Sequence, residues 1–263
     1  MEINGKTIVL GVIGDPISHT LSPPIHNGLA KERGINCVYV PFHVRSEDLE
    51  AAVLGAKALG IRGLNVTIPH KEAIIPFLDT LNDTAKKTGA VNTVLFKDGN
   101  AYGYNTDVGG IIGTFVNNGV DVRGAYCAVI GAGGGARAAA VALSEMGAGS
   151  IAILNRTLSR AEELAERIRS FGTEAFALEV SHAGEIMPEI AIQATSVGLR
   201  DKSESPVTDE RFFSRLRFAM DEVYGEERTE FLKKAERLGV RTADGAEMLR
   251  RQAREAFGVF VGE

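Results

Sequence analysis

The sequence lacks several features that would place it in other classes of protein. Only two of its 263 residues are cysteines, Cys37 and Cys127, and they stand far apart in strand-like runs. With no CxxC pair and no histidine cluster, they are expected to be buried reduced thiols rather than a disulfide or a metal site. No apolar run approaches the ~20 residues of a membrane span. No Pro/Gly/Ser-rich tract or charge block indicates disorder.

Charge is also unremarkable, since no block of Lys and Arg stands out and the formal net charge is −5. A nucleic-acid partner is therefore not expected. The start, MEINGKTIVLG, has no basic segment followed by an apolar stretch and a cleavage site, and we interpret it as the first strand. These absences predict a cytoplasmic protein that binds neither nucleic acid nor membrane. A monomer or homodimer is expected, although the sequence does not determine the oligomeric state. A hydrophobic content of 44% is enough for a sizeable core in one or two domains.

What is present is an alternation of strand and helix patterns. In the first part of the chain, a helix is expected from Ser22-Pro23, with Ser22 as its N-cap, to about Arg33. A second helix is expected from Ser46 to Gly60, and a hairpin over 91–105 turns at Asp98-Gly99. The expected strands of this part are 7–14, 37–44 and 63–69.

The second part starts near Thr106 and alternates in the same way, with a connecting helix from Asp107. This alternation predicts a parallel sheet with helices on both faces. The last helix has apolar residues at helical spacing and is expected to pack on the first part. We therefore predict a domain of residues 1–105, joined by the C-terminal helix 246–263, and a second domain of 106–240. The expected strands of the second domain are 125–130, 150–155, 174–179, 189–195 and 217–224.

A glycine-rich turn follows the first strand of the second domain. Residues 131–136 read Gly131-Ala132-Gly133-Gly134-Gly135-Ala136 and fit the pattern G-x-G-x-x-[GA] between a strand and a helix. Gly131 permits the tight turn, Gly133 lets the backbone approach a pyrophosphate, and Ala136 allows close packing of helix and strand. The helix N-terminus then favours the phosphate. The pattern predicts a Rossmann-type dinucleotide-binding domain, although a flexible loop is the alternative.

The end of the next strand indicates which dinucleotide binds. An NAD site usually places Asp or Glu there for the ribose 2′-hydroxyl, but this chain has Asn155-Arg156-Thr157. Arg156 can pair with a 2′-phosphate through two donors. The sequence therefore favours NADP, with an exposed arginine at the start of a helix as the alternative.

The stretch GLNVTIPHK, residues 63–71, delivers a lysine near the end of a strand, where ligands bind in open α/β sheets. A dehydrogenase needs a group that moves a proton while hydride moves. His70 and Lys71 are both candidates, but neighbouring side chains diverge, so only one would face a cleft. A solvated charge is the alternative for Lys71, and a surface or packing role for each histidine. Asp107, at the start of the connecting helix, would remain ionised there and could pair with Lys71.

Several motifs together resemble the shikimate dehydrogenase family over nearly the whole chain. They are Gly14-Asp15-Pro16-Ile17-Ser18-His19-Thr20-Leu21-Ser22-Pro23 with His26-Asn27, NVTIPHK (65–71), Gly89-Ala90-Val91-Asn92-Thr93, Asn105-Thr106-Asp107, GAGGGAR (131–137) and Asn155-Arg156-Thr157. The resemblance implies an N-terminal open α/β substrate domain, a C-terminal Rossmann-type NADP domain and a cleft between them.

The resemblance also implies a reaction and residue roles. The family reduces 3-dehydroshikimate to shikimate with NADPH, in the pathway to chorismate and the aromatic amino acids. Lys71 and Asp107 would act on the C3 oxygen. Thr20 and Ser22 would bind the substrate carboxylate, assisted by Tyr224. The ring hydroxyls would meet Asp107 and the polar side chains Thr67, Asn92 and Gln252.

Three positions depart from the family's usual residues, namely Thr20 for serine, Gln193 for asparagine, and Gly225-Glu226 for Asn-Pro. A quinate or aminoshikimate dehydrogenase on the same scaffold is the nearest alternative, although quinate-active relatives often carry an acid near the ribose. A non-catalytic NADP-binding sensor is a second alternative. Such a sensor would have no need of both Lys71 and Asp107.

Overall fold

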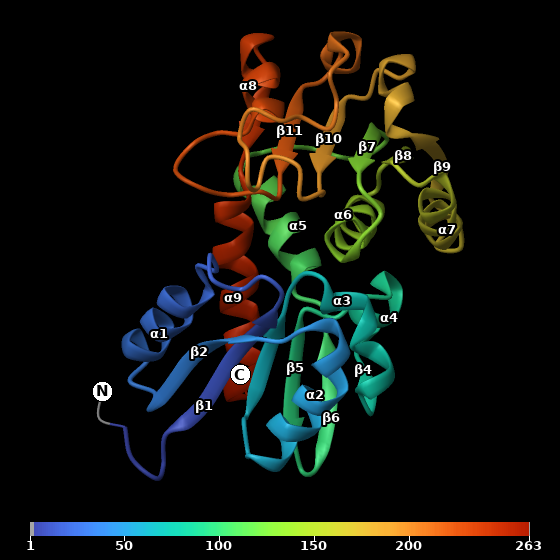
Figure 1. Ribbon diagram of the computed structural model, residues 1–263. Coiled ribbons are helices and arrows are strands. Elements are labelled where there is room, and N and C mark those ends of the chain that lie inside the picture. Colours follow the sequence, from blue (N-terminus) through green and yellow to red (C-terminus); the bar gives the residue numbers. More distant parts are fainter. Residues whose placement is uncertain (1–2, 263) are drawn as a thin grey trace. The chain divides into compact units, whose positions relative to one another are not determined.

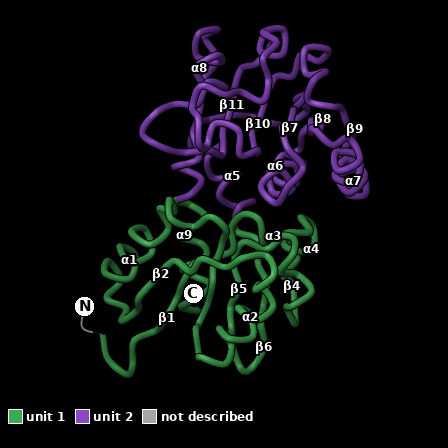
Figure 2. The backbone as a smooth tube through the Cα atoms, in the orientation of Figure 1, with its two compact units in different colours: residues 1–106, 250–263 green, residues 107–249 purple. Residues whose placement is uncertain are grey.

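The computed structural model describes residues 3–262 (Figure 1), so the first two positions of the predicted domain 1–105 and the last position of the helix 246–263 lie outside the described residues. Strands and helices alternate along the chain, which confirms the α/β class. The chain divides into two compact units (Figure 2): unit 1 comprises residues 1–106 and 250–263, and unit 2 comprises residues 107–249. The assignment of substrate to unit 1 and of cofactor to unit 2 remains a prediction.

Unit 1 is built on a mixed six-stranded sheet with the order β2-β1-β3-β5-β6-β4. Strand β1 pairs in parallel with β2 and β3, while β5 is antiparallel to both β3 and β6. The predicted hairpin is confirmed, and its turn residues Asp98 and Gly99 have φ of 49° and 76°, as a tight two-residue turn requires. The strands are β1 (Ile8–Gly14), β2 (Cys37–His43), β3 (Gly63–Val66), β4 (Thr80–Leu81), β5 (Thr93–Lys97) and β6 (Asn100–Tyr104).

Each face of this sheet has its own core because side chains alternate along a strand. Leu10 and Val12 of β1 belong to a cluster with the helices α1 and α9, which includes Phe257. Ile13 of the same strand belongs to a second cluster, which contains Val53 of α2. Helix α2 lies in front of the sheet and α9 behind it in the view of Figure 1. The helices are α1 (Ser22–Glu32), α2 (Leu49–Ala58), α3 (His70–Ala73), α4 (Asp83–Thr88) and α9 (Gly245–Val261), of which α9 belongs to unit 1 from residue 250.

Two local predictions for unit 1 are wrong. Ser22 is not the N-cap but the first helical residue of α1, and the cap position is Leu21. Strand β3 ends at Val66 rather than at residue 69, and the chain turns through Pro69 into the short helix α3. A proline has no N–H for a strand ladder and fixes its own φ, which accounts for the early end of the strand.

Unit 2 is built on an entirely parallel sheet with the order β12-β11-β10-β7-β8-β9. The chain starts at β7 in the middle, runs outward to β9, and then crosses back to β10, which gives the doubly wound arrangement of a Rossmann fold. The strands are β7 (Tyr126–Ile130), β8 (Ser150–Asn155), β9 (Glu174–Glu179), β10 (Ile190–Gln193), β11 (Phe218–Asp221) and β12 (Arg241–Ala243).

Apolar clusters cover both faces of the unit 2 sheet. One contains α5, α6 and α7, and in α6 all the residues Ala138–Leu143 are buried. Their small side chains allow this helix to lie close to the strands. The other cluster contains α8 and the short 3₁₀ segment of Phe212 and Phe213. The helices are α5 (Asp107–Asn117), α6 (Gly134–Glu145), α7 (Leu158–Arg169) and α8 (Glu230–Arg237).

Candidate active site

The N-terminus of α1 carries the two hydroxyls predicted to bind a carboxylate. Ser22 is buried, and its backbone N–H donates to Thr20 Oγ1 at 3.2 Å. Asn27 attaches this helix to β2, because its Nδ2 donates to the Tyr39 carbonyl at 2.9 Å and its Oδ1 accepts from the Tyr39 N–H at 3.0 Å. An anion is favoured at a helix N-terminus. The N-terminus of α1, with the hydroxyls of Thr20 and Ser22, could thus receive an anion, and the carboxylate remains a prediction.

Lys71 lies in the first turn of α3 rather than at a strand end, five residues beyond β3. Its backbone is fixed, because its carbonyl accepts from the Val91 N–H at 2.8 Å. His70 is buried with Nε2 2.7 Å from the Val44 carbonyl, whereas Lys71 is partly exposed. The two neighbouring side chains therefore differ in burial, and they stand in a short helix rather than at the predicted strand end. Thr67, also partly exposed, is joined to the end of β1 by its N–H bond to the Ile13 carbonyl at 3.0 Å.

Three buried side chains of unit 1 form a polar cluster. Asn92 Nδ2 donates to Thr106 Oγ1 at 2.9 Å and to Gln252 Oε1 at 3.3 Å, and Asn92 Oδ1 accepts from the Thr106 N–H at 2.8 Å. The structure therefore brings together Asn92 and Gln252, which are 160 positions apart in the sequence. Thr106, which links them, was not among the candidate residues. Because amide and hydroxyl groups both donate and accept, such a cluster suits the hydroxyl groups of a ligand.

Asp107 begins α5 and is the first residue of unit 2. It follows Thr106 directly, so the chain joins it to the cluster of Asn92 and Gln252. The approach of Asp107 to Lys71 remains a prediction, since these two residues belong to different units.

The glycine-rich turn of unit 2 has the strand–turn–helix context that the sequence predicts. Gly131 follows β7 with φ of 121°, and a Cβ on it would lie 3.1 Å from the Ala194 carbonyl oxygen. Gly133 is the N-cap of α6, and Gly134 and Gly135 form the first helical positions. Ala136 is fully buried against the sheet. The N–H groups at the start of α6 can therefore receive an anion.

The residues that follow β8 lie at the surface of unit 2. Asn155 ends the strand, and its Nδ2 donates to the Thr157 carbonyl at 2.9 Å, which closes a short turn. Arg156 and Thr157 are exposed. This turn holds the backbone on both sides of Arg156 and leaves its guanidinium accessible to a phosphate.

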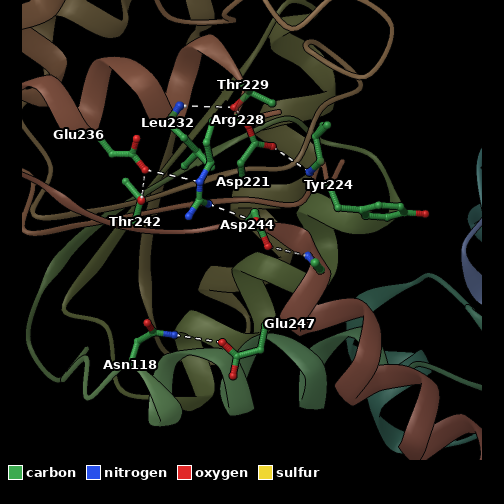
Figure 3. Close-up of polar contacts among 12 residues, drawn as sticks. Asn118, Asp221, Tyr224, Arg228, Thr229, Leu232, Glu236, Thr242, Asp244 and Glu247 are labelled. Atoms are coloured by element: carbon green, nitrogen blue, oxygen red, sulfur yellow. Dashed lines mark hydrogen bonds and ion pairs between the residues drawn. The ribbon is translucent and has the colours of Figure 1, made fainter. Parts of the chain in front are cut away.

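Asp221 at the end of β11 is fully buried and lies at the centre of a network (Figure 3). Its Oδ2 accepts from Thr229 Oγ1 at 2.6 Å, and its Oδ1 accepts from the Val223 N–H at 2.9 Å and from Gln193 Nε2 at 3.2 Å. Burial raises the pKa of Asp221 to about 6, and the hydrogen bonds from Thr229 and Val223 oppose that rise. Gln193, one of the three departures, thus joins β10 to β11.

Tyr224 follows this network by three residues, and its ring points away from Asp221 in Figure 3. Its carbonyl accepts from Lys202 Nζ at 3.3 Å. Beyond it, Gly225 and Glu226 are exposed. Arg228 then anchors the segment, with its guanidinium 3.2 Å from Asp244 and 3.6 Å from Glu236. The segment that carries Tyr224 is therefore held at both ends.

The described part of the chain contains neither a side-chain cluster arranged to hold a metal ion nor a helix able to cross a membrane. Within residues 3–262, no group of three or more His, Cys, Asp or Glu side chains is arranged to hold a metal ion. Over the same residues, none of the helices has the length and apolar character needed to cross a membrane. Both cysteines are buried and unpaired, as predicted.

Comparison with known proteins places these features in one family. A model of the "Shikimate dehydrogenase substrate binding domain" matches residues 12–94, and a model of "Shikimate / quinate 5-dehydrogenase" matches residues 116–210. The shikimate dehydrogenase (NADP(+)) of Caldanaerobacter subterraneus subsp. tengcongensis is 44% identical, over 100% of this chain and 95% of the relative.

Two solved structures are similar over nearly the whole length. The shikimate 5-dehydrogenase of Thermus thermophilus, in complex with NADP(H) and shikimate, has a TM-score of 0.87 and 35% identity over 97% of this chain and 94% of its own. The enzyme of Listeria monocytogenes, in complex with shikimate and NAD, has a TM-score of 0.89 and 31% identity over 100% of this chain and 94% of its own. The chain belongs to the shikimate dehydrogenase family.

Proposed function

We propose that this protein reduces 3-dehydroshikimate to shikimate by hydride transfer from NADPH, in the biosynthesis of chorismate and the aromatic amino acids. The observation that carries the proposal is the buried cluster of Asn92, Thr106 and Gln252 in the same unit as Lys71. This cluster offers neutral donors and acceptors to a hydroxylated ring, and the lysine offers a proton. Relatives with this activity are similar over the full length of the chain.

The residues of unit 2 fit a dinucleotide phosphate. A Cβ added at Gly133 would meet no described atom of another segment within 4 Å, so the backbone is open to close approach at that residue, whereas a Cβ added at Gly135 would collide with the Glu222 carboxylate. The pyrophosphate would be held by the turn Gly131–Ala136, and the 2′-phosphate by the exposed Arg156 with Asn155 and Thr157. The cofactor, when bound, supplies the hydride.

Lys71 would supply the proton in this reaction. As hydride reaches C3 of the substrate, the C3 oxygen gains negative charge, which a nearby ammonium stabilises and neutralises by donating a proton. Asp107 would share this role, as a carboxylate that keeps Lys71 charged.

The remaining candidate residues would position the substrate. Thr20 and Ser22 would hold its carboxylate at the N-terminus of α1, with the help of Tyr224. Thr67, Asn92 and Gln252 would bind the ring hydroxyls. A site built to hydrogen-bond a hydroxyl rejects analogues that lack it by ~10⁴–10⁵, so this set would make the enzyme selective.

The test is turnover of shikimate and of quinate with NADP⁺ and with NAD⁺, followed by the absorbance of the reduced cofactor. We expect the highest kcat/KM for shikimate with NADP⁺. Equal or better turnover of quinate would make the protein a quinate dehydrogenase, the nearest alternative. Binding of NADP⁺ without turnover of either acid would support a sensor instead. We further expect a cytoplasmic enzyme, in keeping with two unpaired cysteines.

A further inference from the structure

Unit 1 contains a buried chain of hydrogen bonds in which the donor and the acceptor of each bond can be assigned, starting from Asn65 of β3. Asn65 Nδ2 donates to the Asn92 carbonyl at 3.1 Å and to Thr93 Oγ1 at 3.0 Å. A carbonyl oxygen can only accept, so the NH₂ end of this amide must face it. The Oδ1 end of Asn65 then faces Tyr39, whose hydroxyl lies 2.7 Å away and must donate.

The same direction continues to the proposed substrate ligands. Thr93 Oγ1 accepts from Asn65, so its own proton goes to Asn92 Oδ1 at 2.9 Å. Asn92 Oδ1 also accepts from the Thr106 N–H, which directs Asn92 Nδ2 toward Gln252 Oε1. Each amide along this path therefore has only one orientation that satisfies its neighbours.

Tyr39 stands at the other end of the chain and is 1% exposed. Its ring stacks on His26 with the ring centres 4.1 Å apart and an angle of 3°. Burial raises the pKa of the Tyr39 hydroxyl well above its ordinary value, and a hydrogen bond with Ser22 opposes the rise. The chain thus runs from Tyr39 through Asn65 and Thr93 to Asn92.

We propose that Tyr39 is a positioning residue for the substrate, because its hydroxyl is the partner of the Asn65 side-chain oxygen and so holds in place the chain that leads to Asn92 and Gln252. The proposal rests on the proposed function, in which Asn92 and Gln252 bind the substrate. Tyr39 would not touch the substrate itself. Backbone groups fix which end of each amide donates, and Tyr39 would hold the Asn65 amide against them.

Tyr39→Phe removes one oxygen atom and keeps the stacked ring, so it tests the proposal with little change in volume. We expect the KM for shikimate to rise about three- to tenfold, the effect of losing about 0.6–1.4 kcal/mol. The KM for NADP⁺ should remain unchanged. Tyr126→Phe is the matched control in unit 2, where this ring packs against Phe176, and it should leave both constants unchanged. A folded Tyr39→Phe protein with an unchanged KM for shikimate would overturn the proposal.

Thr93 provides a second test on the same chain. Thr93→Val removes the relay hydroxyl and should raise the KM for shikimate, whereas Thr93→Ser keeps the hydroxyl and should restore it. Tyr39→Phe and Thr93→Val interrupt one path, so their effects should be less than additive, while Tyr39→Phe and Arg156→Gln should add. Additive effects of Tyr39→Phe and Thr93→Val would contradict the proposal.

A third measurement needs no substrate and so separates this proposal from the proposed function. Exchange of the Thr106 amide hydrogen, which is bonded to Asn92 Oδ1, should be faster in Tyr39→Phe than in the wild type, and the Val223 amide beside Asp221 should be unaffected. Unchanged protection of the Thr106 amide would overturn the positioning role. A wild type without shikimate turnover would overturn only the proposed function.

Discussion

The two units bury polar groups of different kinds. In unit 1 the buried polar side chains are almost all neutral amides and hydroxyls, such as Asn65, Asn92 and Thr106, and they bond to one another. In unit 2 the buried groups include the ionisable Arg137 and Asp221. Neutral groups that both donate and accept suit a polyhydroxylated ring, whereas a phosphate is met by backbone N–H groups and an exposed arginine. The difference in buried polarity therefore matches the difference in proposed ligand.

Burial shifts the pKa of one titratable group in each unit, and the two pKa shifts have opposite directions. His26 of unit 1 is fully buried, and burial lowers its pKa to about 3. Neither of its ring nitrogens has a hydrogen-bond partner among the described residues. Asp221 of unit 2 has its pKa raised to about 6. Each group is therefore held in its neutral form more strongly than in an unfolded chain.

The largest expected effect is a loss of catalytic rate without a loss of cofactor binding, because we assign proton transfer to unit 1 and the cofactor to unit 2. Lys71→Ala should lower kcat by about 10²–10⁴-fold, as expected for loss of a general acid. The dissociation constant for NADP⁺ should remain unchanged, because Lys71 belongs to unit 1. Steady-state kinetics and a fluorescence titration of the cofactor measure the two quantities. Lys57→Ala, on α2 of the same unit, is the control. A near-normal kcat would reduce Lys71 to a surface charge.

The second prediction concerns acid unfolding of unit 1. The unfolded chain binds a proton on His26 below pH 6.5, and the folded chain does so only near pH 3. Stability should therefore be lost as the pH falls through this range, by up to about 5 kcal/mol. His26→Phe keeps the stacked ring and should remove this pH dependence. Native-state hydrogen exchange of the β1 and β3 amides measures it. An equal pH dependence in wild type and variant would exclude His26 as the cause.

The third prediction concerns Asp221 of unit 2, which should make stability fall as the pH rises, the opposite of the effect of His26. Folded Asp221 keeps its proton up to about pH 6, whereas the unfolded chain releases it near 3.8. This group should therefore reduce stability as the pH rises from about 4 to about 6, by up to about 3 kcal/mol. Compared with the wild type, Asp221→Asn should gain stability over that range. Hydrogen exchange of the β10 and β11 amides is the measurement, with β1 as the internal control. A constant difference between the two proteins across the range would refute the prediction.

The smallest effect concerns cofactor choice. A charge-assisted bond from Arg156 to a 2′-phosphate is worth ~1.5–3 kcal/mol, or a preference of roughly 10–150-fold, and exposure favours the lower end. Arg156→Asp should abolish the preference for NADP⁺ over NAD⁺ in kcat/KM. Arg211→Asp, an exposed arginine of the same unit that pairs with Asp209, should leave the preference intact. If the ratio of the two cofactors is the same in Arg156→Asp and wild type, Arg156 is not the selector.

The fold of unit 2 could be predicted closely because its strands are short apolar runs bounded by turns. The predicted strands 150–155 and 174–179 match β8 and β9. In contrast, β12 and β4 were missed, since strands of two or three residues carry too little pattern to be recognised. Helix α4 was also missed, although Asn82 caps it and Gly89 ends it in a left-handed conformation.

Local sequence patterns could not predict how the residues of the candidate site come together. The proximity of Asn92 and Gln252 depends on the return of the C-terminal helix to unit 1, which no local pattern contains, and the family resemblance alone supplied both residues. Tyr39 and Asn65 fall within the expected strands 37–44 and 63–69, and neither was among the candidate residues. A signal was available, because Asn is uncommon inside a strand as apolar as GLNV, and a buried amide requires partners.

Unit 1 is built from two separate stretches of the chain, and this affects the order in which the units can fold during synthesis. A Cβ on Gly63 of β3 would collide with the ring of Phe260, so the last helix packs directly on the sheet. Unit 2 is one continuous stretch, whereas unit 1 needs residues from both ends of the chain. Because synthesis runs from the N-terminus and domains fold as units, the unit that leaves the ribosome first is the last to be completed. Until then α1 alone covers that face of the sheet, and the apolar side chains that α9 will cover remain exposed on the nascent chain.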